Sequence, residues 1–133
     1  MTSLWLAVAL LAIWPFSSGK VYRMTAASVV PAASGTVHVQ KDKDNGNMKL
    51  DIEVHSLAKP SALTPSEGAY LVWVRPNGGE PVKQGAIGVG NNLNGELKLE
   101  TTSKDFELFI TAEQSESVAM PSGVEVLKTR VGP

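Results

Sequence analysis

Residues 36–55 read TVHVQKDKDNGNMKLDIEVH, which is two alternating runs joined by an Asn-Gly turn signal. In the first run valine alternates with polar residues, and in the second Leu50, Ile52 and Val54 do the same. Alternation with a period of two predicts strands with one buried face and one wet face. An Asn-Gly pair between two such runs predicts a hairpin. This stretch therefore favours an antiparallel, all-β fold.

The expected turn type sets the pairing in this hairpin. If Asn45 and Gly46 form a two-residue type I′ turn, Val37 faces Val54 across the pair, and apolar side chains of both strands share one face. The opposite face is then wholly polar. A slip of one residue would expose the valines, so the pattern specifies which face is buried.

The rest of the chain after Gly19 has the same character. No stretch there carries apolar residues at helical spacing for three turns, and short alternating runs are separated by Gly, Pro, Asn and Asp. Seven or eight short strands are typical of an immunoglobulin-like antiparallel β-sandwich, and a barrel is the alternative. The expected strands are Val21–Ala27, Thr36–Lys41, Met48–His55, Ala69–Arg75, Val82–Val89, Glu96–Thr102, Phe106–Ala112 and Val124–Arg130.

Two of these strands differ in how much of them is apolar. The run Ala69–Val74 is apolar on both faces, which predicts a central strand with Trp73 in the core. Alternation predicts that the row beginning at Phe106 points inward. The row expected to point outward consists of Glu107, Phe109, Thr111 and Glu113.

Residues 4–16 read LWLAVALLAIWPF and carry no charge. A membrane-spanning helix needs about 20 apolar residues, and this run has the length of a signal-peptide core. We expect residues 1–19 to be a signal peptide and residues 20–133 to form one domain, exported to the periplasm or outside the cell. Because no Lys or Arg precedes the run, two alternatives stay open. These are an uncleaved anchor, which would touch the membrane only through residues 4–16, and a start position that has lost a basic segment.

Composition excludes several classes of function. The 12 basic and 13 acidic residues leave a formal net charge of −1, whereas binding to nucleic acid needs a basic excess. Zero cysteines exclude disulfides, thiolate metal sites, cysteine nucleophiles and a lipidated N-terminal cysteine. No serine lies in a Gly-x-Ser-x-Gly motif. Glycines 85, 88 and 90 have no helix after them and predict a bulge or a close strand approach instead of a phosphate loop. We therefore predict no catalytic residue, no enzyme activity and no cofactor.

His38, Glu53 and His55 form the candidate metal site. In the expected register His38 lies directly opposite Glu53 and diagonal to His55, with Cβ atoms about 5 to 8 Å apart. Imidazole and carboxylate together suit zinc, nickel or copper(II). The alternative is a solvated polar face. The neighbouring Lys41–Asn47 has some likeness to a calcium loop, but it lacks the acidic residue at the twelfth position and predicts a charged hairpin tip.

The segment Gln114–Pro121 is the candidate interaction loop. Loops at the end of a sandwich commonly carry recognition, and we name Gln114, Glu116 and Met120 as its contact residues, with Met120 at the surface. The loop Leu57–Gly68 is a second candidate for binding. The alternative is that Gln114–Pro121 is a plain connection. The expected partner is a protein or a small ligand.

The second half of the chain resembles a known family over residues 69–130. It is similar to the extracytoplasmic C-terminal domain of anti-sigma-K-type factors, which implies an immunoglobulin-like sandwich outside the cytoplasmic membrane. The matching motifs are Tyr70-Leu71-Val72-Trp73-Val74, Gly79-Glu80-Pro81-Val82 followed by Gly85, Phe106 to Glu113 with its late Thr-x-Glu, and Pro121-Ser122-Gly123.

The chain also departs from that family. It has no His-x3-Cys-x2-Cys zinc motif and no full membrane span before the domain, so sigma-factor binding is not carried over. The first hypothesis is an exported, non-catalytic binding module. The second is a periplasmic metal-binding protein, and the third is a membrane-tethered sensor domain.

Overall fold

The protein folds into eight antiparallel strands, as the sequence predicts. The computed structural model describes residues 19–133, so the predicted signal peptide or anchor lies outside the described residues except for Gly19. None of the helices found in residues 19–133 is long and apolar enough to cross a membrane. The strands are β1 Lys20–Ala26, β2 Ser34–Lys41, β3 Met48–His55, β4 Ala69–Pro76, β5 Val82–Ala86, β6 Gly95–Thr101, β7 Phe106–Glu113 and β8 Glu125–Val131.

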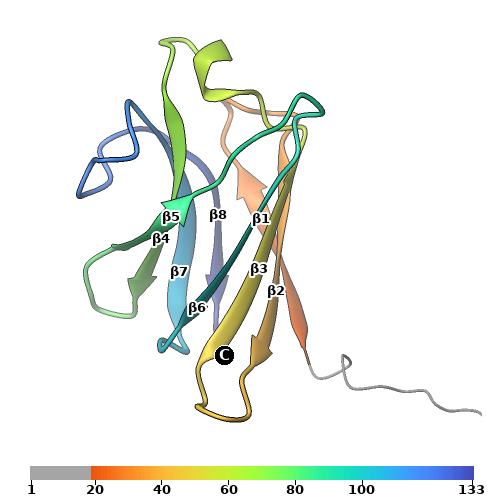
Figure 1. Cartoon of the computed structure of the whole chain (residues 1–133), viewed down its shortest axis with the longest axis vertical. Coiled ribbons are helices and arrows are strands. Elements are labelled where there is room, and N and C mark those ends of the chain that lie inside the picture. Colours follow the sequence, from red (N-terminus) through yellow and green to blue (C-terminus); the bar gives the residue numbers. More distant parts are fainter. Residues whose placement is uncertain (1–18) are drawn as a thin grey trace, which may run out of the picture.

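The strands form a sandwich that is nearly closed into a barrel. Their order is β5-β4-β7-β8-β1-β2-β3-β6, and Figure 1 shows β4, β7 and β8 in one layer and β2 and β3 in the other. Strand β1 joins the two layers, because Lys20–Met24 pair with β2 and Thr25 and Ala26 pair with β8. This arrangement confirms the expected immunoglobulin-like, all-β class.

The main core lies between the two layers. The apolar rows predicted for the hairpin and for β7 point into it, and these side chains are fully buried or nearly so. Tyr70 also contributes, and its hydroxyl donates a hydrogen bond of 2.5 Å to the carbonyl oxygen of Ala58 in the β3–β4 loop. Burial raises the pKa of Tyr70 to about 12. Representative core residues are Val37, Ile52, Val72, Leu108, Ile110 and Leu127.

A second, smaller apolar cluster lies on the outer side of β4 and β7. It contains Leu71, Trp73 and Phe109, with Val118 packed against it. Trp73 is buried as predicted, but in this outer cluster and not in the main core. Phe109 lies in the predicted outward row, but it is buried there, because Val118 of the loop between β7 and β8 packs on this side of the sheet.

The register of the β2–β3 hairpin differs from the prediction by two residues. Val37 faces Ile52 and His38 faces Asp51. The loop is longer than two residues, because the backbone N–H of Asp42 donates to the carbonyl oxygen of Asn47 at 2.8 Å. A type I′ turn needs positive φ at both Asn45 and Gly46, and of these two residues only Gly46 has it. A shift of two residues keeps the predicted faces and changes only the partners.

The glycines after Lys83 do mark a bulge and a close approach. Gly85 has a φ of 150° and lies opposite β4 where the register shifts between Val72 and Trp73. Strand β5 therefore ends at Ala86, before the predicted Val89. At Gly95 an added Cβ would lie 2.2 Å from the carbonyl oxygen of Gly88, so the two backbones approach too closely for a larger residue.

Candidate functional site

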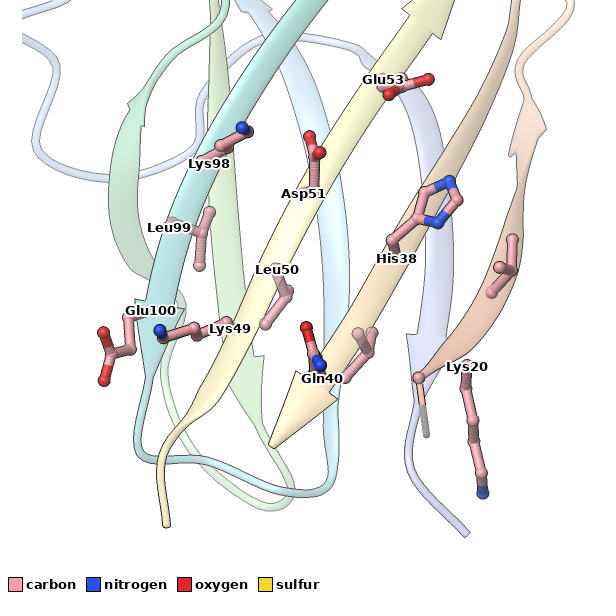
Figure 2. Close-up of a pocket in the computed structure, with 13 residues that line it drawn as sticks. Lys20, His38, Gln40, Lys49, Leu50, Asp51, Glu53, Lys98, Leu99 and Glu100 are labelled. Carbon is pink, nitrogen blue, oxygen red and sulfur yellow. The ribbon is translucent and has the colours of Figure 1, made fainter. Parts of the chain in front are cut away.

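The outer face of β1, β2, β3 and β6 is polar and open to water. Its side chains form rows across the strands, and Figure 2 shows His38, Asp51 and Lys98 in one such row. Val21 lies beside His38 and is 58% exposed. The face is hollowed into a shallow concavity of about 710 Å³ lined by residues of all four strands. Volumes of this size hold small ligands, but such pockets are usually enclosed and mainly apolar, whereas this one is open and lined by charged and apolar residues alike.

The candidate metal ligands do not come together as a set of three. His55 lies beside Glu53, with His55 Nε2 at 3.9 Å from Glu53 Oε1. His38 faces Asp51, whereas His55 faces Ser34, four residues away along β2. Four residues of strand span about 13 Å. The longer hairpin loop is the physical reason for this separation, since it moved the pairing by two residues.

A cluster of carboxylates occupies the same face. Asp51, Glu53 and Glu96 each place an oxygen within 4.8 Å of the others, and Glu53 directly faces Glu96. A hydrogen bond with Asp51 and the charge of Asp51 raise the pKa of Glu96. Carboxylates suit Ca²⁺, but that ion takes about six to eight oxygens, and the group found among residues 19–133 consists of these three. Mutual repulsion is the main electrostatic property of the cluster.

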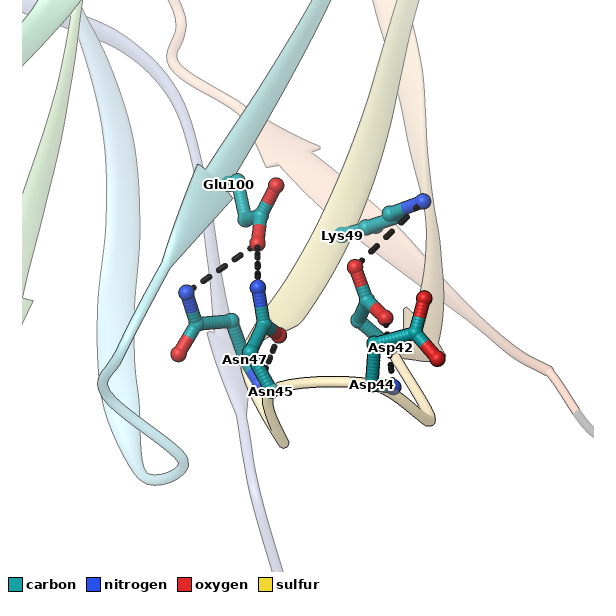
Figure 3. Close-up of polar contacts among 6 residues, drawn as sticks. All are labelled: Asp42, Asp44, Asn45, Asn47, Lys49 and Glu100. Atoms are coloured by element: carbon teal, nitrogen blue, oxygen red, sulfur yellow. Dashed lines mark hydrogen bonds and ion pairs between the residues drawn. The ribbon is translucent and has the colours of Figure 1, made fainter.

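The side chains of the charged hairpin tip, residues 41–47, make hydrogen bonds within the tip and with Glu100 of β6 (Figure 3). Asp42 Oδ1 accepts a bond of 2.9 Å from the backbone N–H of Asp44, and this bond is the main cause that lowers the pKa of Asp42. Asn45 and Asn47 both donate through Nδ2 to Glu100 Oε2, at 3.1 and 3.0 Å. These contacts agree with a structural hairpin tip, as the sequence predicts.

The β7–β8 loop, residues 114–124, is anchored by the carboxylate of Glu113. Glu113 is 1% exposed, although it lies in the row that alternation predicts to point outward. Its Oε2 accepts from the backbone N–H groups of Ser122 and Gly123, both at 3.1 Å, and its Oε1 accepts from Ser122 Oγ at 2.7 Å. The far end of the loop is thereby fastened to the residue from which the loop departs.

The same carboxylate ends a buried polar chain. Trp73 Nε1 donates to Thr111 Oγ1 at 2.8 Å, and Thr111 Oγ1 donates to Glu113 Oε2 at 2.6 Å. Burial alone would raise the pKa of Glu113, but the hydrogen bonds from Thr111, Ser122 and Gly123 outweigh it, and the pKa is lowered. Glu113 is therefore a buried carboxylate that stays ionised at neutral pH.

The loop presents the three predicted contact residues to water. Gln114 and Glu116 are exposed, and Met120 is exposed over 50% of its surface, so the predicted surface position of Met120 is confirmed. The middle of the loop is also held, because Lys83 Nζ donates to the carbonyl oxygen of Glu116 at 2.7 Å.

The second candidate loop, Leu57–Gly68, leaves the same end of the sandwich. Ala69 pairs with Glu113, and the backbone N–H of Gly68 donates to the carbonyl oxygen of Glu113 at 2.9 Å. A short 3-10 helix, Pro60–Ala62, lies within this loop. The two loops predicted to bind therefore meet at the residue that anchors one of them.

Glu113 is the residue that sequence reasoning missed. One signal could have revealed it: Pro121-Ser122-Gly123 supplies free N–H groups in a turn, and a carboxylate at the start of the loop is a suitable acceptor. Gly123 belongs to the same arrangement, because an added Cβ there would lie 1.7 Å from the carbonyl oxygen of Ala112. No protein-family model and no curated protein matches this chain.

Proposed function

We propose that the protein is an exported, non-catalytic interaction module that binds a partner protein through the β7–β8 loop. The observation that carries the proposal is the buried Glu113 carboxylate, which holds the loop in place while Gln114, Glu116 and Met120 face water. A loop that is ordered before binding loses less conformational entropy when the partner arrives.

The side chains of the loop define the kind of partner. Met120 has a flexible, polarisable thioether that adapts to an apolar pocket. Gln114 and Glu116 provide the polar rim that usually surrounds such a contact. The partner therefore offers an apolar pocket, with hydrogen-bond donors or a basic group beside it.

Export is supported by the uncharged run of residues 4–16 and by where the fold begins. Strand β1 starts at Lys20, directly after the expected cleavage point, so cleavage there removes no residue from the sandwich. An intact mass that begins at Lys20 supports export with cleavage, and an intact mass that includes residues 1–19 contradicts it. The likeness to anti-sigma-K-type domains stays a prediction. The membrane-tethered sensor also stays a prediction, because its tether would be formed by residues 4–16, which lie outside the described residues.

Site-specific photo-crosslinking in the source organism tests the binding surface. A photoreactive amino acid replaces Met120 in one strain and Val29, which is 39% exposed in the β1–β2 loop, in the control strain. We expect a discrete crosslinked protein at position 120 that is absent at position 29. The proposal fails if position 120 yields no discrete product or the same products as position 29.

Two further measurements test the rest of the proposal. Turnover of ester, glycoside or phosphate substrates by the purified protein would overturn the non-catalytic assignment. The metal-binding alternative stays a prediction, although His38 faces Asp51 and not Glu53 as expected. Titration with Zn²⁺, Ni²⁺ or Cu²⁺ tests it: affinity tighter than about millimolar that is lost in His38→Ala would support the alternative.

A further inference from the structure

Asparagine followed by glycine is chemically labile, because glycine has no Cβ to hinder attack by its backbone nitrogen on the asparagine side chain. For this attack, the asparagine side chain and the glycine nitrogen must be free to rotate until the two groups meet. Local structure therefore decides which pairs react. The described chain contains three such pairs: Asn45-Gly46, Asn77-Gly78 and Asn94-Gly95.

In the pair at the hairpin tip, both the Asn45 side chain and the Gly46 N–H are fixed by hydrogen bonds. Asn45 Nδ2 donates to Glu100 Oε2 at 3.1 Å, and Asn45 Oδ1 accepts from the backbone N–H of Asn47 at 2.9 Å (Figure 3). The N–H of Gly46 donates to the carbonyl oxygen of Asp42 at 2.8 Å. These bonds must break before the reacting atoms can meet.

The pair at the start of β6 is held by packing. Asn94 Oδ1 accepts from the backbone N–H of Ser56 at 3.4 Å, and the carbonyl oxygen of Asn94 accepts from Gly90 at 3.0 Å. Gly95 is paired with Val54 and packs closely on Gly88. Its backbone has no room to rotate towards the Asn94 side chain.

The remaining pair lies in the exposed β4–β5 turn. The backbone N–H of Asn77 donates to the carbonyl oxygen of Asp105 at 3.1 Å, but within residues 19–133 neither the Asn77 side chain nor the Gly78 N–H makes a hydrogen bond. Gly78 has a φ of 76°, and an added Cβ there would meet nothing within 4 Å. A hydrogen bond of 2.8 Å from the Gly79 N–H to the carbonyl oxygen of Pro76 closes the turn, but this bond leaves the Asn77 side chain and the Gly78 N–H free to rotate.

We propose that Asn77 is the site of spontaneous deamidation in this protein. The Gly78 nitrogen loses its proton to solvent and bonds to Cγ of Asn77. The Cγ–Nδ2 bond then breaks, and the amide nitrogen takes a proton from solvent and leaves as ammonia. Water then opens the resulting succinimide to aspartate or isoaspartate, with no oxidation or reduction. The product adds one negative charge to a chain whose formal net charge is −1.

Peptide mass spectrometry of the full chain tests the proposal after incubation in mildly alkaline buffer, with a parallel sample in urea. In the folded protein we expect Asn77 to deamidate about tenfold or more faster than Asn45 and Asn94, because those residues must first break hydrogen bonds. In urea the three rates should converge. Asn77→Gln should abolish the fast conversion. The proposal is overturned if Asn45 or Asn94 reacts as fast as Asn77 in the folded protein.

Discussion

The outward rows of β3 and β7 lie on different layers of the sandwich and in different environments. On β3 the outward residues Asp51, Glu53 and His55 are half-buried or exposed. On β7 the outward residues Phe109, Thr111 and Glu113 are each 1% exposed. Alternation determines the side of the sheet on which a residue lies. It does not determine whether another segment covers that side.

The covering segment explains the difference between the faces. The β7–β8 loop packs Val118 on the outer cluster and ties Ser122 to Glu113, whereas the β2–β3 hairpin tip bonds mainly to itself and to Glu100 (Figure 3). A loop that packs on the outer face of its own sheet excludes water from that face and buries its side chains in a second apolar cluster. Substitutions on each face measure how far the two faces differ in their contribution to stability.

Trp73→Ala has the largest expected effect. The indole is fully buried beneath the β7–β8 loop, and its removal leaves a cavity that destabilises the fold by about 3 to 5 kcal/mol. Urea denaturation measures this change. The control is Val21→Ala on the open face, where we expect a change within about 0.5 kcal/mol. Similar costs for the two variants would mean that the loop does not seal the β4–β7 face.

Periodicity predicts the strands and their faces, whereas hydrogen bonds made by particular side chains lie outside what it predicts. Alternation is local, so it identified all eight strands and the inward row of β7. The length of the hairpin loop was not predicted, because it depends on the side chains of Asp42 and Asn45 binding the backbone two residues further on. The burial of Glu113 was not predicted, because it depends on a contact with Ser122 and Gly123 that no periodicity encodes.

Glu113→Gln tests the anchor of the loop. The amide keeps the shape but directs N–H groups at the donors that surround Glu113, and hydrogen bonds to an ionised acceptor are worth about 2 kcal/mol each. We therefore expect a loss of about 2 kcal/mol, with faster hydrogen exchange at the Ser122 and Gly123 amides. The matched control is Glu107→Gln on the same strand face, where a half-exposed pair with Arg75 should cost less than about 1 kcal/mol. Equal losses of stability in the two variants would mean that the buried Glu113 carboxylate contributes no more than the half-exposed ion pair.

The pH dependence of the same residue provides a separate test. Because the pKa of Glu113 is lowered in the fold, its contribution is fully present above the ordinary value of 4.5 and is lost as pH falls through the folded pKa. The stability gap between the wild type and Glu113→Gln should therefore be constant near neutral pH and shrink below pH 4.5. Taking this difference removes the effect of other carboxylates, including Asp42. A gap that persists in strong acid would contradict the role of the ionised carboxylate.

The open face gives the smallest effect, and its sign is reversed. Asp51 raises the pKa of Glu96, so ionised Glu96 destabilises the fold at neutral pH, and Glu96→Gln should raise the melting temperature slightly. The gain should disappear as pH falls below 4.5, where the carboxyl is neutral in both the folded and the unfolded chain. The matched control is Glu100→Gln on the same strand face, which should lower the melting temperature because Glu100 accepts bonds from Asn45 and Asn47. If Glu96→Gln also lowers the melting temperature, the carboxylate cluster is stabilising, and the repulsion inferred for the polar face is wrong.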